Sequence, residues 1–154
     1  MAINTQRVLL GGLAAGVVLN IIDGAVNGFI LKDRMRADGN AFKAGFGDQM
    51  AAMDPTAIFT YIGLDFVVGI LLVWTYAAIR PRLGPGAKTA VNVAILFWVF
   101  GMILTTGYMM MGIMSRGLWF TYSLIWLVNL ILASLVGGWV YKEEALTAAT
   151  APRV

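Results

Sequence analysis

The chain has 154 residues, of which 60% are apolar and only 12% are charged, and its net charge is +3. Soluble domains are about 45–50% apolar and about 25% charged, so this composition excludes an ordinary soluble fold. The sequence has no cysteine and no histidine, which excludes disulfides, thiol chemistry and the usual zinc, copper and haem ligands. We therefore expect neither a metal nor a cofactor.

Four apolar stretches, each of 24 or 25 residues, occupy most of the chain. As helices they would be about 36 Å long, enough to cross a hydrocarbon core of about 30 Å. The four stretches are Val8–Leu31, Thr56–Ile79, Thr89–Ile113 and Leu118–Tyr141. They predict an all-α polytopic membrane protein: an antiparallel bundle of four transmembrane helices in a single domain, residues 1–145, followed by a disordered tail, residues 146–154. The first stretch is too long for the apolar region of a cleaved signal peptide, so we expect it to be retained.

The first stretch carries small and polar residues along one helical face. Gly12 and Gly16 form a GxxxG step, which lets a neighbouring helix approach closely. Asn20, Asp23 and Asn27 continue the same face at spacings of three and four. We interpret the glycine pair as a helix-packing surface.

The connection Asp33–Pro55 is longer than the other two. Phe42, Phe46, Met50 and Met53 recur in it at intervals of four, four and three. That spacing is typical of a short amphipathic helix on the bilayer surface, but three glycines between residues 39 and 47 equally favour a solvated loop. Asp54-Pro55 is expected to begin the next helix.

Turn residues end the second and third stretches. A cluster from Pro81 to Gly86 and a short hairpin from Met114 to Gly117 are the predicted turns. Six basic residues lie on the side of the termini and five on the other side. The density of Arg80, Arg82 and Lys88 in one short loop therefore places both termini in the cytoplasm. These charges at the span ends indicate a membrane surface and no nucleic-acid partner.

Two aspartates fall inside the spans, where an ionised carboxylate costs about 2.5–3.5 kcal/mol on insertion scales. Counted from the midpoints of their spans, Asp23 and Asp65 lie at nearly the same depth. No basic residue is available at that depth, so such a pair is expected to keep at least one proton. Further polar residues are predicted at or near this level: Asn20, Asn27, Tyr61, Thr105, Thr106, Tyr108, Tyr122 and Asn129.

The central stretch Tyr76-Ala77-Ala78-Ile79-Arg80-Pro81-Arg82, continuing to Ala90, resembles the central loop of small four-span bacterial membrane proteins usually recorded only as hypothetical. The segments Gly11–Asn20 and Gly138–Glu143 are similar too. The resemblance implies a bacterial inner-membrane protein with four helices. It assigns no catalytic or binding residue.

Three classes of function fit these observations. The first is a non-enzymatic accessory or scaffold subunit of a membrane complex, or a homo-oligomer, in which the polar residues hold helices together. The second is a small proton- or cation-coupled transporter or channel that uses Asp23 and Asp65. The third is a protein that acts on or binds lipid. We favour the first class and expect no enzymatic activity, because no nucleophile–base pair is evident.

Overall fold

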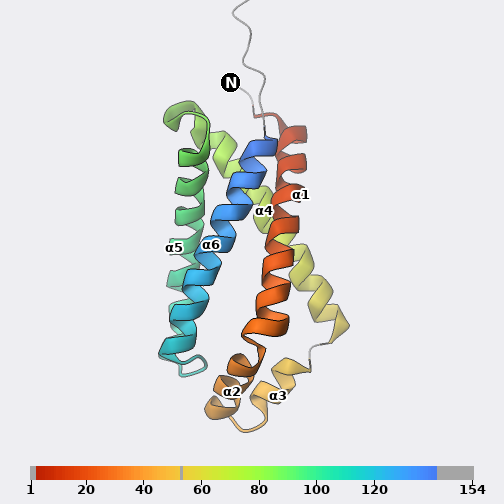
Figure 1. Ribbon diagram of the computed structural model, residues 1–154, viewed down its shortest axis with the longest axis vertical. Helices are drawn as coiled ribbons and strands as arrows, with labels where there is room; N and C mark the ends of the chain where they lie inside the picture. Colours follow the sequence, from red (N-terminus) through yellow and green to blue (C-terminus); the bar gives the residue numbers. More distant parts are fainter. Residues whose placement is uncertain (1–2, 53, 142–154) are drawn as a thin grey trace, which may run out of the picture.

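The computed structural model describes residues 3–52 and 54–141 and shows an antiparallel bundle of helices (Figure 1). Within these described residues, four helical segments are long and apolar enough to cross a membrane, which confirms the predicted all-α membrane fold. The beginning of α1 and the end of α6 lie at one end of the bundle, and α2 and α3 lie at the other. The helices are α1 (Thr5–Ala25), the π-helix η1 (Val26–Ile30), α2 (Lys32–Phe42), α3 (Phe46–Ala51), α4 (Pro55–Leu83), α5 (Ala87–Met110) and α6 (Arg116–Val140). The predicted tail, residues 146–154, lies outside the described residues.

The first span begins at a capped end and finishes in a distorted turn. The Asn4 side chain accepts a hydrogen bond from the Arg7 N–H at 3.1 Å, which caps α1. After Ala25 the hydrogen bonds widen to the π pattern, in which the Leu31 N–H donates to the Val26 carbonyl at 2.8 Å. The predicted span up to Leu31 is therefore helical almost throughout, but its last turn is not α-helical.

The second span is longer than predicted at its C-terminal end. Asp54 caps it by accepting from the Thr56 N–H at 2.9 Å, and Pro55 is its first residue, as expected. We expected Pro81 to lie in a turn, but α4 continues to Leu83. Pro81 lies in the last turn, where the missing N–H removes one bond without ending the helix. Gly84, with φ of 84°, then terminates it.

The third span is shorter than predicted, and the fourth begins earlier. Helix α5 ends at Met110 and not at Ile113, because Gly112 adopts the left-handed conformation with φ of 77°. Helix α6 begins at Arg116 under a cap by Ser115, whose hydroxyl accepts from the Leu118 N–H at 3.2 Å. The turn between these helices, residues 111–115, therefore begins before the predicted hairpin from Met114 to Gly117.

The long connection is a helical hairpin, which differs from both forms that the sequence suggested. Lys43 is extended and Gly45 has φ of 80°, so the chain turns between α2 and α3. Phe42 and Phe46 consequently lie on different helices, with their rings edge to face at 5.9 Å. A single amphipathic helix through these side chains is therefore wrong, and Met53 lies outside the described residues.

The tightest packing lies in the half of the bundle that carries the beginning of α1 and the end of α6. Its buried core draws on all four membrane helices: Val8, Ala15, Leu19, Leu72, Val73, Val93, Ala94, Leu130 and Ala133. A smaller apolar cluster (Val26, Leu31 and Leu118, with Ile22 of α1 packed against it) joins α1, η1 and α6 at the opposite end. Helix α1 therefore packs against α6 along most of its length, whereas α4 crosses behind α1 and diverges towards its own N-terminus (Figure 1).

Candidate functional site

The predicted glycine surface of α1 packs against α4 within this chain. A Cβ atom on Gly12 would lie 2.6 Å from the Ile70 Cα, and one on Gly16 would lie 2.9 Å from the Phe66 Cα. The contact is reciprocal, because a Cβ atom on Gly69 would overlap the Gly12 carbonyl oxygen. Only glycine allows the two backbones to approach this closely.

These contacts fix the register between α1 and α4. The Asn20 amide extends it by donating to the Gly16 carbonyl on its own helix at 2.9 Å and to the Ile62 carbonyl on α4 at 3.3 Å. The opposed pairs are Gly12 and Ile70, Gly16 and Phe66, and Asn20 and Ile62.

On this register the two aspartates do not lie opposite each other. Asp65 faces the level of Val17 and Asp23 faces the level of Phe59, an offset of six residues or about 9 Å along the axis. The expectation of equal depth is therefore wrong. Side chains on both helices tilt towards their own N-termini, so the two carboxylates lean towards each other.

Asp23 is hydrogen-bonded to α6 and not to α4. The amide of Asn129, which is fully buried, donates to Asp23 Oδ1 at 2.8 Å and to the Leu19 carbonyl at 3.5 Å. The Asn129 Oδ1 atom is buried without a hydrogen-bond partner among the described residues. This pair is a polar contact between α1 and α6 inside the apolar bundle.

The remaining predicted polar residues divide into two groups. Asn27 in η1 and Tyr122 in α6 are half-buried, and Tyr61 is exposed on α4. Thr105 instead donates to the Gly101 carbonyl one turn earlier on α5, at 2.9 Å, and Thr106 donates similarly to the Met102 carbonyl. Tyr108 is half exposed on α5.

The polar cluster therefore joins α1, α4 and α6, and α5 contributes little to it. The polar groups in this cluster are carboxylates, amides and phenols. In residues 3–52 and 54–141, no three acidic side chains gather in a way that could hold a metal ion.

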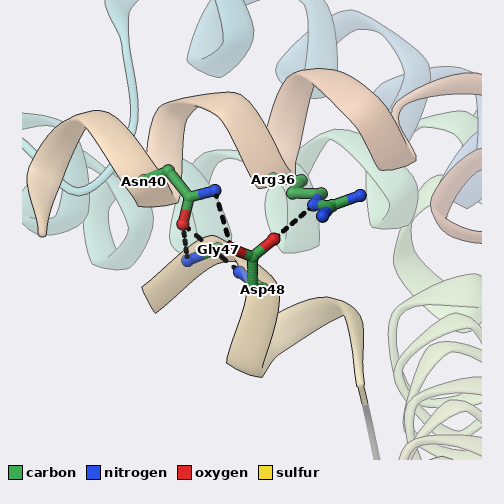
Figure 2. A network of polar contacts seen from close by, with 4 residues as sticks. All are labelled: Arg36, Asn40, Gly47 and Asp48. Atoms are coloured by element: carbon green, nitrogen blue, oxygen red, sulfur yellow. Dashed lines mark hydrogen bonds and ion pairs between the residues drawn. The ribbon is translucent and has the colours of Figure 1, made fainter. Parts of the chain in front are cut away.

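A second polar network holds the α2–α3 hairpin together (Figure 2). Asn40 Oδ1 accepts from the backbone N–H groups of Gly47 and Asp48 at 2.8 and 3.3 Å, which caps the first turn of α3. The Asp48 carboxylate accepts from Arg36 Nε and from the Asn40 amide. Gly47 must lack a side chain, because a Cβ atom there would overlap the Arg36 carbonyl oxygen.

The hairpin is also fixed to the rest of the bundle. Asp38 Oδ2 accepts from the Ser115 N–H at 2.8 Å, beside the first turn of α6. Sequence reasoning missed this network and also the contact of Ser134 with the Ala90 carbonyl at 2.8 Å. Neither set of residues shows a distinctive spacing, so the sequence alone carried no signal for them.

The N-terminal half of α4 is the least packed part of the membrane bundle. From Pro55 to Leu64 only Ala57 is half-buried and the other residues are exposed. The most apolar stretch of α4 is only 17% buried, against 28–33% in the other three spans. This surface includes the Tyr61 side chain and borders on Asp65, which is half-buried.

Comparison of this chain with models of protein families, with curated proteins and with solved structures finds no match.

Proposed function

We propose that the protein is a non-enzymatic accessory or scaffold subunit of a membrane complex and that the N-terminal half of α4 receives a partner helix. The observation that carries this proposal is the exposure of Pro55–Leu64 within a membrane-spanning helix. The apolar stretches of the other three spans are more buried, at 28–33% against 17%, and no described part of those spans has ten consecutive residues with a single half-buried side chain.

The chemistry of the exposed surface favours a protein partner over lipid. Hydrocarbon offers no hydrogen bond to the Tyr61 hydroxyl or to the Asp65 carboxyl group, and polar groups within membranes usually face other helices. A partner helix carrying donors or acceptors would satisfy both groups. A second copy of this chain and a different membrane protein both meet this requirement.

The polar cluster supports a structural role for the same reason. Asn20 and Asn129 direct their amides to groups on other helices. In the opposite half of the bundle, the buried side chains of Thr89 and Ser134 bond to the backbone carbonyls of Gly84 and Ala90. The core around them is apolar. Transport through one copy would need a polar path through that half, so we favour the scaffold.

The basic residues near the α4–α5 turn also indicate which side of the membrane the termini lie on. We infer a bacterial inner-membrane protein with both termini in the cytoplasm, on the basis of Arg80, Arg82 and Lys88 near one turn. A reporter fused after Val154 should behave as cytoplasmic, and one inserted near Gly45 as periplasmic. A periplasmic C-terminus would contradict the assignment.

Cysteine cross-linking tests the partner surface cleanly because the chain contains no cysteine. Phe59→Cys places a single thiol on the unpacked half of α4, where Phe59 is 73% exposed. Ile103→Cys is the matched control on α5 in the same half of the bundle, where Ile103 is 68% exposed. In native membranes, a bifunctional thiol–amine reagent should give a discrete adduct with Phe59→Cys and none with Ile103→Cys.

The mass of that adduct distinguishes the two kinds of partner. Twice the mass of the chain identifies a second copy, and any other discrete mass identifies a different protein. Equal yields at both positions would indicate random collision and would refute the docking surface. The absence of any adduct with Phe59→Cys would refute it as well.

A further inference from the structure

Helices α4, α5 and α6 border a half-open cavity of about 220 Å³ near the α4–α5 turn. Its walls are mainly apolar: Tyr76, Ala87, Ala90, Leu135, Gly138 and Trp139. Trp139 is 67% exposed, so the cavity reaches the lipid-facing surface of the bundle. Its lining residues come from the C-terminal parts of α4 and α6 and from the start of α5, and none of them belongs to the polar cluster. These parts of the helices lie at the end of the bundle opposite α2 and α3 (Figure 1).

The lining of this cavity suits a hydrocarbon chain. The Tyr76 hydroxyl already accepts from the Gly86 N–H at 3.0 Å, so it does not depend on water for a partner. The volume equals that of about seven water molecules in the liquid, but waters at such a site would find few polar partners. An acyl chain from the surrounding bilayer meets no such cost.

Two exposed basic residues lie at the same end of the bundle as the cavity. Arg82 is in the last turn of α4 and Lys88 is in the first turn of α5, one residue from Ala87, and both side chains are exposed. The described acidic residues all lie elsewhere, and Glu143 and Glu144 follow the described end of α6. By the predicted topology, this side of the membrane carries six basic residues against these two glutamates, so basic residues remain in excess.

We propose that this cavity binds one anionic phospholipid, with an acyl chain between α4, α5 and α6 and its phosphate beside Arg82 and Lys88. Selectivity comes from the head group, because the acyl chain moves between two apolar environments. Phosphatidylglycerol carries one net negative charge and phosphatidylcholine carries none. Phosphatidylglycerol should therefore bind at least about fivefold more tightly, the gain that corresponds to about 1 kcal/mol for a basic residue at an anionic surface.

The test uses the full chain purified in a neutral detergent. Dioleoyl phosphatidylglycerol or dioleoyl phosphatidylcholine is titrated into the micelles, and bound lipid is counted by native mass spectrometry while Tm is recorded. One phosphatidylglycerol per chain should remain bound and raise Tm by mass action, at concentrations where phosphatidylcholine does neither.

Two variants and their controls locate the site. Arg82→Gln with Lys88→Gln should remove the preference for phosphatidylglycerol, whereas Lys32→Gln with Lys43→Gln, the same charge change at the other end, should keep it. Gly138→Leu should fill the cavity, because the nearest atoms to a Cβ there lie 3.4 Å away on the Tyr76 ring. Gly107→Leu, on an open surface of α5, is its control.

Equal binding of the two lipids would overturn the proposal. So would a preference that survives both Gly138→Leu and the double substitution at Arg82 and Lys88. The outcome is independent of the α4 partner surface, because these residues lie at the other end of α4 and cross-linking at Phe59 does not require them.

Discussion

Gly12→Ala should destabilise the bundle, because Gly12 lies where the backbones of α1 and α4 meet. The added Cβ would lie 2.6 Å from the Ile70 Cα, whereas carbon atoms prefer about 3.5–4.0 Å. The helices must therefore separate by about 1 Å, and no change of rotamer can relieve a contact with backbone. Overpacking of this kind costs about 1–3 kcal/mol. In a chain of this size that loss lowers Tm by about 2–12 °C.

Gly24→Ala is the matched control on the same helix, since a Cβ there meets nothing within 4 Å. It should be neutral or stabilise the protein by about 0.5–1 kcal/mol, because alanine is the better helix former. Thermal unfolding of both variants in one detergent, followed by circular dichroism, should thus show shifts of opposite sign or of clearly different size. If Gly12→Ala were as stable as Gly24→Ala, the close contact and the register derived from it would be refuted.

Three further outcomes follow from the polar contacts. Asp23→Asn should leave Tm nearly unchanged, whereas Asn129→Leu should cost about 0.6 kcal/mol, the average for hydrogen bonds between membrane helices; equal losses would argue that ionised Asp23 has a role of its own. Hydrogen bonds from Arg36 and Asn40 hold the pKa of Asp48 below its ordinary value. The α2–α3 contact should therefore keep its full strength above about pH 4 and weaken as the pH falls through the lower pKa of the folded state. Hydrogen exchange in α3 should show this acid sensitivity in the wild type but not in Asp48→Asn. Gly47→Ala should separate α2 from α3 and raise exchange in α3 without lowering Tm as much as Gly12→Ala; protection equal to that of the wild type would contradict the overlap with Arg36.

Hydropathy predicted the membrane spans because each of them must satisfy the same requirement of length and apolar composition. It could not place their ends. Met111 and Ile113 prolong the apolar run of the third span, yet α5 ends at Met110, because Gly112 adopts the left-handed conformation just beyond it. In α4 the prediction was too short instead. Pro81 was expected to lie in a turn, but a proline in the last turn of a helix costs only one hydrogen bond, and α4 continues to Leu83. The ends depend on local backbone geometry, which a hydropathy average does not contain.

The sequence indicated which polar residues lie inside the spans but did not indicate which of them pair. Counting from span midpoints assumes that neighbouring helices are aligned at their centres, whereas Gly12 and Gly69 set the alignment at the point of closest approach. Asn129 rather than Asp65 is therefore the hydrogen-bond partner of Asp23. The sequence identified all three residues, but only the packing of small side chains decides which of them meet.

The distribution of glycine also explains why one half of α4 is packed and the other is not. Gly69 lets α4 approach α1 at the level of Gly12 and Gly16. Towards the N-terminus of α4, Gly63 has no atoms within 4 Å of its Cβ position, and Gly24 on α1 is equally open. Two helices that cross closely at one point must diverge away from it, so the close contact and the open segment are consequences of one crossing. A partner helix that fills the open side would act on the same crossing. We therefore expect Gly12→Ala to weaken cross-linking at Phe59→Cys as well as to lower Tm, whereas Gly24→Ala should preserve both; undiminished cross-linking in Gly12→Ala would show that the partner surface does not depend on the crossing.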